Sequence, residues 1–511
     1  MISRKHLLSL AIAPLSLVAQ DTIEPDNRPN ILLFMVDDMG WQDTSLPFWT
    51  EKTPLNERYH TPNMERLAGE GKMFTQAYAS SVSSPTRVSL MTGMNASRHR
   101  VTNWTLHKNT SPDRKSEILE FPAWNVNGIC QAPNIPLTYQ VTALPQILKD
   151  NGYHTIHCGK AHFGAIDTPG ENPHHLGFEV NIAGHAAGGP ASYLGEDNFG
   201  NRTDGQASSV FAIPGLENYW GTETFATEAL TIESIKALDK AKKLGQPFFL
   251  YMSHYAIHVP LDKDMRFYQK YREQGLSENE AAYASLIAGM DKSLGDLMDW
   301  LEANSLSDNT IILFMSDNGG LSASGVRDKP LHTHNAPLNS GKGSAYEGGV
   351  REPMIVKWPG KVTPKTKSNE FVIIEDFFPS ILEMAQVKEY KTLQPIDGVS
   401  FTQLLTEDGA KASPRNLYWN FPNLWGATGP GIGPTCTIRS QDWKLIYYYK
   451  TGEKELFNIA EDIGETKNMA AQNPAITLKL SKDLGEHLRT VDAQRPSFKA
   501  TGEPCPWPDE I

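Results

Sequence analysis

The feature that most constrains the fold is a pair of unbroken apolar runs that each end in acidic residues. The first run, Asn30–Val36, reads NILLFMV and leads directly into two aspartates. The second occupies residues 310–315 and leads into Ser-Asp-Asn-Gly-Gly. Runs without polar alternation are typical of strands buried on both faces, as in parallel sheets covered by helices. Ligand sites in such sheets gather beyond the carboxyl ends of the strands. The sequence therefore predicts an α/β fold with a functional site where these two strands end.

The polar residues at the two strand ends have the chemistry of a divalent-cation site. Adjacent carboxylates repel each other unless a cation holds them together. Calcium prefers hard oxygen ligands, and an all-protein oxygen cage suits calcium better than magnesium. The predicted metal ligands are Asp37, Asp38, Asp317 and Asn318. A solvated turn is the alternative for either segment taken alone.

A second informative stretch is SSPTRVSLMTG at residues 83–93. Pro85 suits the first turn of a helix, where its missing amide would have no partner in any case. Ser83 would then stand just before the helix, where free amides favour an anion. Arg87 would lie one turn along on the same face. The stretch could thus present a hydroxyl, a guanidinium and backbone amides to one oxyanion. The alternative is an N-capped helix with a surface arginine, because serine is a common cap.

Composition limits the classes of partner. The 511 residues include 47 Lys and Arg against 59 Asp and Glu, so the net charge is −12 and nucleic-acid binding has no electrostatic support. An anionic substrate is still compatible, because binding depends on local cations and metal. The four cysteines permit one or two disulfides, whose pairing the sequence does not determine. They are Cys130, Cys158, Cys436 and Cys505.

The N-terminus has the pattern of an export signal. Arg4 and Lys5 precede an apolar run at residues 7–18, which is followed by Ala19. The run is too short to span a membrane, and no other stretch is long enough. We expect a signal peptide at residues 1–20 and an exported protein, periplasmic or secreted, without stable membrane insertion. A buried N-terminal helix is the alternative.

A lysine and a histidine follow a predicted strand in the middle of the chain. Residues 143–152 are typical of a helix closed by glycine, and residues 153–157 of a strand. Lys160 and His162 then share a parity at the strand end, so both could face one pocket. An ordinary surface loop is the alternative.

Residues 83–93 resemble the signature of the formylglycine-dependent (type I) sulfatases of the alkaline phosphatase superfamily, Ser/Cys-x-Pro-x-Arg followed by Leu-x-Thr-Gly. In that family a maturase oxidises the first residue, here Ser83, to formylglycine (3-oxoalanine). Its hydrate is the nucleophile and binds the metal. Serine rather than cysteine implies a radical-SAM maturase of anaerobic bacteria, and Thr86 departs slightly from the usual Ser or Ala. The metal quartet matches, and the motifs keep the family's order over residues 30–488.

The resemblance also implies roles for the other catalytic residues. Arg87, Lys160 and Lys342 would hold the sulfate oxygens, with Lys342 in a glycine-rich segment at residues 340–353. His258 would protonate the leaving alcohol. His162 would contact the formylglycine hydrate and assist its regeneration.

Substrate contacts are expected from loops near these motifs. Residues 95–140 are rich in Trp, Asn, Pro and Ser, which is typical of an irregular loop over a site. His107 in this loop is a candidate contact, as are Arg327 and His334 ahead of the glycine-rich segment. His254 is the alternative to His258 as the acid, and a structural role suits it better.

The pattern changes near the C-terminus. Residues 416–420, 436–438, 443–449 and 455–457 are typical of short antiparallel strands, and residues 474–491 of a helix. We expect a sulfatase catalytic domain at residues 21–405 with a large mixed, mostly parallel sheet between helices. We expect an α+β subdomain at residues 406–511 that carries a four-stranded antiparallel sheet.

Together these features predict an exported bacterial carbohydrate sulfatase that removes sulfate from the end of a glycan chain. Sulfated galactose or N-acetylgalactosamine is the substrate that the resemblance favours. One alternative is a phosphatase or phosphodiesterase of the same superfamily, which would share the metal site. Another is a catalytically inactive relative that only binds glycans.

Overall fold

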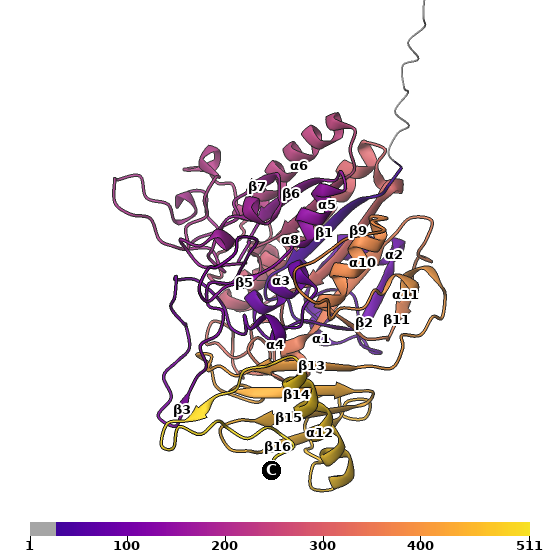
Figure 1. Ribbon diagram of the computed structural model, residues 1–511. Coiled ribbons are helices and arrows are strands. Elements are labelled where there is room, and N and C mark those ends of the chain that lie inside the picture. Colours follow the sequence, from indigo (N-terminus) through magenta and orange to yellow (C-terminus); the bar gives the residue numbers. More distant parts are fainter. Residues whose placement is uncertain (1–26) are drawn as a thin grey trace, which may run out of the picture.

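The computed structural model describes residues 27–511 of the chain (Figure 1). The predicted signal peptide lies outside these residues. The described part is built on a nine-stranded sheet in the order β11-β2-β10-β9-β1-β8-β6-β7, with β12 paired to β2. Its strands are β1 (Asn30–Val36), β2 (Lys72–Tyr78), β6 (His154–Gly159), β7 (Val180–Ile182), β8 (Phe248–Ser253), β9 (Thr310–Ser316), β10 (Arg351–Lys357), β11 (Thr366–Ser368) and β12 (Val372–Ile373).

Most neighbours in this sheet are parallel. Strand β1 pairs in parallel with both β8 and β9, and β6 pairs in parallel with β8 and β7. Strand β10 runs antiparallel to β9 and β2, which makes the sheet mixed. The predicted fold class, a large and mostly parallel mixed sheet between helices, is confirmed.

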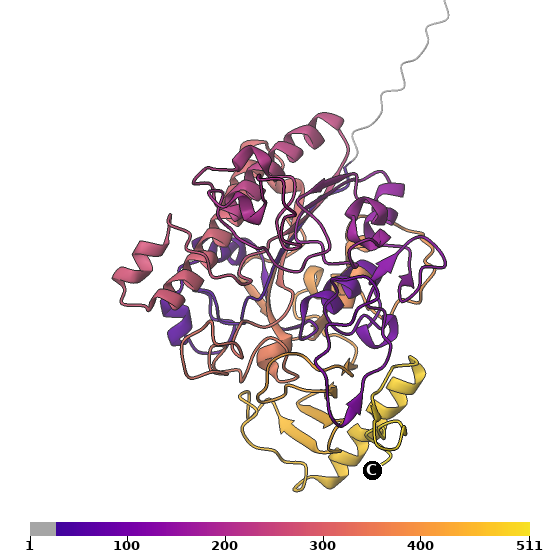
Figure 2. The same cartoon turned by 90° about the vertical axis from the view of Figure 1, so that its left-hand side faces the viewer.

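The side chains of β1 alternate between two layers of helices. Figures 1 and 2 show these helices on the two sides of the sheet. Leu32, Phe34 and Val36 pack in a core with α2, α6, α7 and α8, whereas Ile31 and Leu33 pack with α3, α5 and α10. The helices are α1 (Pro54–Arg58), α2 (Pro62–Glu70), α3 (Ser83–Thr92), α4 (Ala96–His99), α5 (Leu144–Asp150), α6 (Ala226–Leu244), α7 (Tyr268–Glu273), α8 (Glu278–Ala303), α9 (Glu347–Val350), α10 (Phe377–Met384), α11 (Thr402–Thr406) and α12 (Pro474–Thr490). Burial on both faces explains why β1 has no polar alternation.

Local sequence signals set the ends of the long helices. The Ser277 hydroxyl caps α8 by accepting a hydrogen bond from the Glu280 amide. Helix α6 ends where Gly245 adopts a left-handed conformation, φ +68°. Within residues 27–511, none of the helices combines the length and the apolarity that crossing a membrane requires.

A second, antiparallel sheet of four strands lies in the C-terminal region, as predicted (Figure 1). Its strands are β13 (Asn416–Phe421), β14 (Thr435–Ser440), β15 (Trp443–Tyr448) and β16 (Lys454–Asn458). Helix α12 packs on it through Leu480, Leu484 and Leu488. Strand β17 (Ser497–Phe498) pairs with β3 (Leu119–Glu120), so the loop at residues 95–140 reaches this region. The last short pair is β4 (Ile129–Cys130) with β5 (Tyr139–Gln140).

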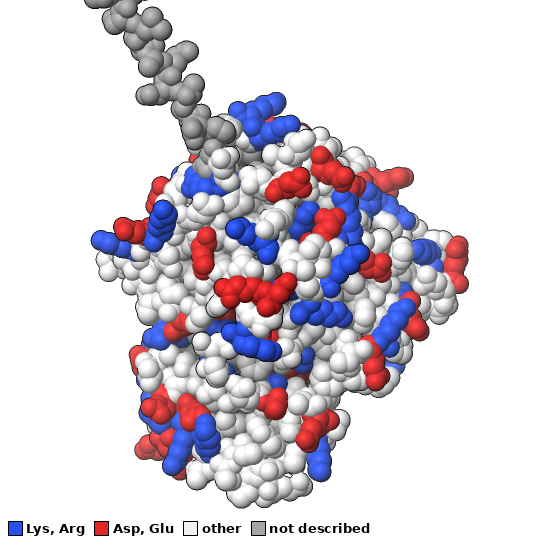
Figure 3. All heavy atoms as spheres, turned by 90° about the vertical axis from the view of Figure 1, so that its right-hand side faces the viewer, with Lys and Arg blue, Asp and Glu red and all other residues white. Residues whose placement is uncertain are grey.

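All four cysteines are buried and form no disulfide. On the face drawn in Figure 3, basic and acidic side chains are interspersed rather than gathered into a field of one sign.

A buried ion network joins the C-terminal sheet to helix α9, which leads into strand β10 of the large sheet. The Lys444 ammonium on β15 lies 3.1 Å from the Glu347 carboxylate at the start of α9 and 3.0 Å from that of Glu465. Glu347 also accepts hydrogen bonds from Tyr78 at 2.9 Å and Arg351 at 3.3 Å. Burial alone would raise the pKa of Glu347, but Lys444 and Arg351 hold it well below its ordinary value. The network therefore fixes α9, which follows the Lys342 segment, against the C-terminal sheet.

We expect Lys444→Met to lower the free energy of unfolding by about 3–5 kcal/mol, because it leaves buried carboxylates without their cation. Urea unfolding followed by circular dichroism measures this, with the exposed Lys450→Met as the matched control. A loss no larger than that of the control would show that the network contributes nothing to the junction.

Candidate active site

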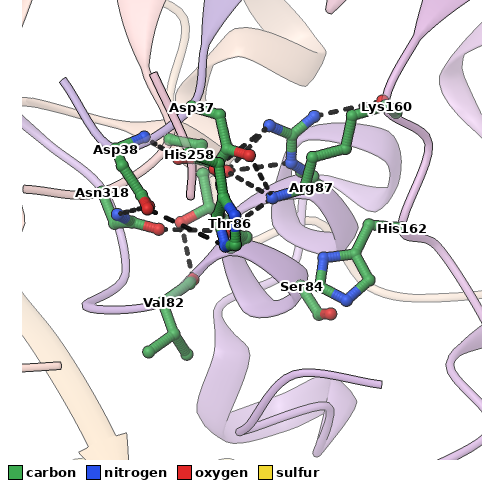
Figure 4. A network of polar contacts seen from close by, with 12 residues as sticks. Asp37, Asp38, Val82, Ser84, Thr86, Arg87, Lys160, His162, His258 and Asn318 are labelled. Atoms are coloured by element: carbon green, nitrogen blue, oxygen red, sulfur yellow. Dashed lines mark hydrogen bonds and ion pairs between the residues drawn. The ribbon is translucent and has the colours of Figure 1, made fainter. Parts of the chain in front are cut away.

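The ends of β1 and β9 bring the predicted metal ligands together. Figure 4 labels three of them, Asp37, Asp38 and Asn318. The two strands pair in parallel with Val36 opposite Ser316, so the residues that follow meet at one edge of the sheet. The Asn318 amide donates to Asp38 Oδ1 at 2.8 Å, and the Asp38 amide donates to Asp317 Oδ1 at 3.3 Å. Oxygens of Asp37, Asp38 and Asp317 lie within 4.8 Å of one another, and all three residues are fully buried.

Ser83 lies at this cluster, one position further into the helix than its sequence predicted. Val82 is the extended N-cap residue of α3, with φ −143° and ψ 162°, and Ser83 is the first helical residue. Its hydroxyl does not cap the helix. Ser83 Oγ lies 3.1 Å from Asn318 Oδ1 and 3.3 Å from Asp37 Oδ1, and it accepts a hydrogen bond from the Lys160 ammonium at 2.9 Å. The hydroxyl is thus directed at the carboxylate cluster.

Each of the three carboxylates pairs with a buried cation, namely Arg87, Lys160 or Lys342. Arg87 donates to Asp317 Oδ2 from Nε at 2.9 Å and lies 2.8 Å from it through Nη2. Its Nη1 donates to the Lys160 carbonyl at 3.2 Å and to Ser253 Oγ. The arginine is therefore buried and not a surface residue, which decides against the simple capped-helix interpretation.

The two lysines pair with the other carboxylates. Lys160 Nζ lies 2.7 Å from Asp37 Oδ2, and Lys342 Nζ lies 2.6 Å from Asp38 Oδ1. Each cation comes from a different segment, namely α3, the end of β6 and the loop before α9. The structure therefore brings together all the residues that the resemblance assigned to sulfate binding.

The surrounding charges shift the pKa values of the three carboxyls in different directions. Burial alone would raise all three, but Arg87 and Lys160 lower the pKa of Asp317, and Lys342 and His258 lower that of Asp38. The pKa of Asp37 is well above its ordinary value, because burial and the charge of Asp317 act together. Asp38 Oδ2 is buried and accepts no hydrogen bond from the described residues. This oxygen-only cluster fits a divalent cation, which would relieve the repulsion and give the orphaned oxygen a partner.

Two histidines flank the cluster. His258 Nε2 lies 3.9 Å from Asp38 Oδ2, and its Nδ1 lies 2.7 Å from the Val259 carbonyl. Because that carbonyl can only accept, Nδ1 carries a proton and Nε2 faces the site. Burial and the charge of Lys342 lower the pKa of His258 to about 3. His162 Nε2 lies 2.9 Å from the Thr105 carbonyl, and burial holds its pKa well below the ordinary value.

The glycine pair at residues 188–189 leaves the space that the rings of His162 and His258 occupy. The sequence did not indicate this role. A Cβ at Gly188 would lie 2.3 Å from the His162 ring, and one at Gly189 would lie 2.5 Å from that of His258. Only glycine permits these contacts. His254 is buried instead against Ser293 of α8, with its Nε2 2.9 Å from Ser293 Oγ. It is therefore the structural histidine of the two candidates.

A cavity of about 360 Å³ opens above this cluster. Its charged and polar floor includes Ser83, His162, His258 and Lys342. Its walls are mostly apolar and come from separate segments; they include Trp104, Phe211, Val326 and Trp425. The sequence pointed to the loop that carries Trp104 but gave no sign that the C-terminal region contributes Trp425.

The three residues predicted as substrate contacts do not line this cavity. Arg327 is fully buried, where both its Nε and its Nη2 donate to Glu280 at 2.8 Å. His334 Nε2 lies 2.7 Å from the Asp328 carbonyl, also inside the protein. His107 is exposed outside the lining. Arg327 and His334 thus hold their own loop in place. The Glu280 carboxylate of α8 occupies the Arg327 guanidinium, and the Asp328 carbonyl lies at the His334 ring.

Comparison with known proteins agrees with this geometry. The family described as Sulfatase matches residues 29–387, and the one described as N-sulphoglucosamine sulphohydrolase, C-terminal, matches residues 341–494. The chain belongs to the sulfatase family. It is therefore a sulfuric ester hydrolase, and the residues that match the Sulfatase family include the carboxylate cluster described above.

Several relatives are similar along nearly their whole length. A sulfatase of Formosa agariphila is 29% identical over 563 aligned positions, which cover 99% of this chain and 97% of that protein. An N-acetylgalactosamine-6-O-sulfatase of Bacteroides thetaiotaomicron is 27% identical over an alignment that covers 93% of this chain and 95% of that protein. The structure of Ps i-CgsB in complex with k-i-k-neocarrahexaose is 27% identical, covers 92% and 94%, and has a TM-score of 0.71. A phosphonate monoester hydrolase of Agrobacterium radiobacter, 19% identical with a TM-score of 0.59, shares the fold.

Metal removal should change the stability of the protein, because a cation that binds only the folded state stabilises it by about 2.7 kcal/mol at a hundredfold excess over Kd. We expect EDTA to lower the Tm of the wild type and Ca²⁺ to restore it. Asp38→Asn should abolish both effects, whereas the exposed Asp204→Asn should keep them. Differential scanning calorimetry measures the Tm. A wild-type Tm that changes with neither chelator nor calcium would contradict metal binding.

Proposed function

We propose that the protein is an exported carbohydrate sulfatase that uses Ser83, oxidised to formylglycine, as its nucleophile. One observation carries this proposal. The Ser83 hydroxyl lies at the floor of a cavity between three carboxylates and the cations of Arg87, Lys160 and Lys342. Such a floor can hold an anionic ester and a reactive oxygen together. The calcium ligands in this proposal are Asp37, Asp38, Asp317 and Asn318, with the modified Ser83.

The oxidation of Ser83 accounts for turnover. Conversion of its Cβ alcohol to an aldehyde removes two electrons and two protons, which an anaerobic radical-SAM maturase would accept. The aldehyde hydrate carries two hydroxyls on one carbon. One attacks sulfur, and deprotonation of the other expels sulfate and restores the aldehyde. An unmodified serine could accept the sulfate group but would have no such way to release it.

The chain's own residues provide the charge and proton chemistry. The Lys160 ammonium already lies 2.9 Å from Ser83 Oγ, so it stabilises negative charge on that oxygen and on the sulfate. Asp317 is the nearby carboxylate proposed to accept the nucleophile's proton. Arg87 and Lys342 would orient the remaining sulfate oxygens. A bound divalent cation would add Lewis-acid stabilisation of developing oxyanion charge.

The two histidines have separate tasks in this proposal. His258 Nε2 faces the site, while its Nδ1 proton is committed to the Val259 carbonyl. Approach of the anionic ester favours protonation of Nε2, which then donates to the leaving sugar oxygen. His162 Nδ1 has no hydrogen bond from the described residues, so it is free to take the proton of the second hydroxyl.

The substrate class is proposed from the relatives and the cavity. One similar protein is named an N-acetylgalactosamine-6-O-sulfatase, and another was solved in complex with k-i-k-neocarrahexaose. A cavity of about 360 Å³ suits one sugar ring. We therefore favour exo action on a terminal sulfated galactose or N-acetylgalactosamine. Export is proposed from the N-terminal sequence pattern. The division between residues 21–405 and 406–511 is proposed because residues of the C-terminal region form most of a core cluster of their own.

Release of inorganic sulfate from a panel of sulfated monosaccharides and oligosaccharides tests the proposal. The enzyme is co-produced with an anaerobic maturase, and we expect Ser83→Ala to lose activity by several orders of magnitude because no nucleophile remains. A phosphate monoester of the same sugar serves as the competing substrate. Phosphate release that Ser83→Ala leaves intact, without sulfate release, would instead establish the phosphatase alternative.

A further inference from the structure

We propose that Trp104 and Trp425 form an aromatic wall that binds the ring of the sulfated sugar, and that Asp113 positions both tryptophans. This inference rests on the proposed function and names how the substrate is held. Both side chains line the cavity above Ser83 and Lys342, yet they belong to segments far apart in the sequence. We call this pair the tryptophan wall.

Trp425 lies directly on the chain beside Lys342. A Cβ built at Gly343 would lie 2.2 Å from Cε3 of the Trp425 ring, so the ring occupies the space that only a glycine leaves. Gly343 itself has φ +85°, and its amide donates to the Ser81 carbonyl at 2.7 Å. The ring is therefore fixed next to a sulfate-binding lysine and close to the segment that carries Ser83.

Trp104 is anchored to the other side of the reactive groups. The next residue, Thr105, donates its amide to Ser84 Oγ at 3.0 Å, and its carbonyl lies 2.9 Å from His162 Nε2. Trp104 is thus one residue away from contacts with both the helix of the nucleophile and the regenerating histidine. Each tryptophan is positioned relative to a different catalytic group.

A single carboxylate joins the two segments. Asp113 Oδ1 accepts hydrogen bonds from the side chain of Asn103 at 2.9 Å and from the amide of Leu424 at 3.2 Å. These residues immediately precede Trp104 and Trp425. Asp113 Oδ2 accepts further bonds from Asn423 at 2.9 Å and from the buried Trp124 at 3.1 Å. Asp113 therefore connects the loop at residues 95–140 to the C-terminal loop at the residues next to the two tryptophans.

The chemistry of the wall suits a pyranose. A sugar ring presents C–H groups on its faces, which pack against aromatic rings, and it keeps its hydroxyls at its edge. Ser324 also lines the cavity, and its hydroxyl has no partner among the described residues, so it could bind one edge hydroxyl. The charged floor would receive the sulfate, while the wall would hold the ring that carries it.

Steady-state kinetics on the sugar sulfate that the wild type hydrolyses best tests this inference. We expect Trp104→Ala and Trp425→Ala each to raise KM by roughly tenfold and to change kcat much less, since burial of a sugar face is lost in ground and transition states alike. Trp425→Phe should recover part of the loss. Trp443→Ala, in strand β15 of the C-terminal sheet and outside the cavity, is the matched control and should keep the wild-type KM.

Asp113 is tested as a positioning residue through its coupling to the wall. Asp113→Asn should raise KM in the wild type but add nothing in the Trp104→Ala/Trp425→Ala double variant, because non-additivity marks residues that act through one another. An equal increase in both backgrounds would overturn the positioning role. A KM unchanged by either tryptophan variant, in an enzyme that hydrolyses the sugar sulfate, would overturn the wall alone. A wild type that releases sulfate from no sugar would overturn the proposed function itself.

Discussion

The structure depends on a balance of buried charge at the ends of two parallel strands. Asp37, Asp38 and Asp317 are removed from water, and burying an unpaired carboxylate costs several kcal/mol. Arg87 and Lys160, with a third cation from the loop before α9, offset that cost at distances of 2.6–2.9 Å. Because these cations come from separate elements, the strand ends fix how α3, β6 and the glycine-rich loop pack. A divalent cation and an anionic ester would enter a site whose charges are already arranged for both.

The same packing links distant parts of the chain to the reactive centre. Lys444 of the C-terminal sheet holds Glu347, and Trp425 from the same region lies on Gly343. The C-terminal region therefore contributes a side chain to the lining of the cavity as well as contacts that hold the surrounding fold. Charge chemistry is concentrated at the cavity floor, whereas the apolar walls come from loops that can vary without disturbing the sheet. Such a division allows one reaction to be applied to different sugars.

Much of the fold and of the reactive centre could be predicted from the sequence, because the signals were local. Apolar runs mark the central strands, and residues such as Asp37 and Asp317 follow them at fixed positions. What could not be predicted depends on long-range contacts. Arg327 is bound by Glu280 of a distant helix, and nothing in its own segment indicates this. Trp425 lines the cavity from a C-terminal loop that is hydrogen-bonded to Asp113, more than 300 residues away in the sequence.

We propose that the Ser83 side chain is the reactive group, and mass spectrometry of the peptide that contains it tests this directly. Protein made with an anaerobic maturase should yield a peptide lighter by two hydrogen atoms at Ser83, which reacts with a hydrazine reagent as an aldehyde does. Protein made without the maturase should yield the unmodified serine and release no sulfate. Full sulfatase activity in a preparation whose Ser83 is entirely unmodified would contradict a formylglycine nucleophile.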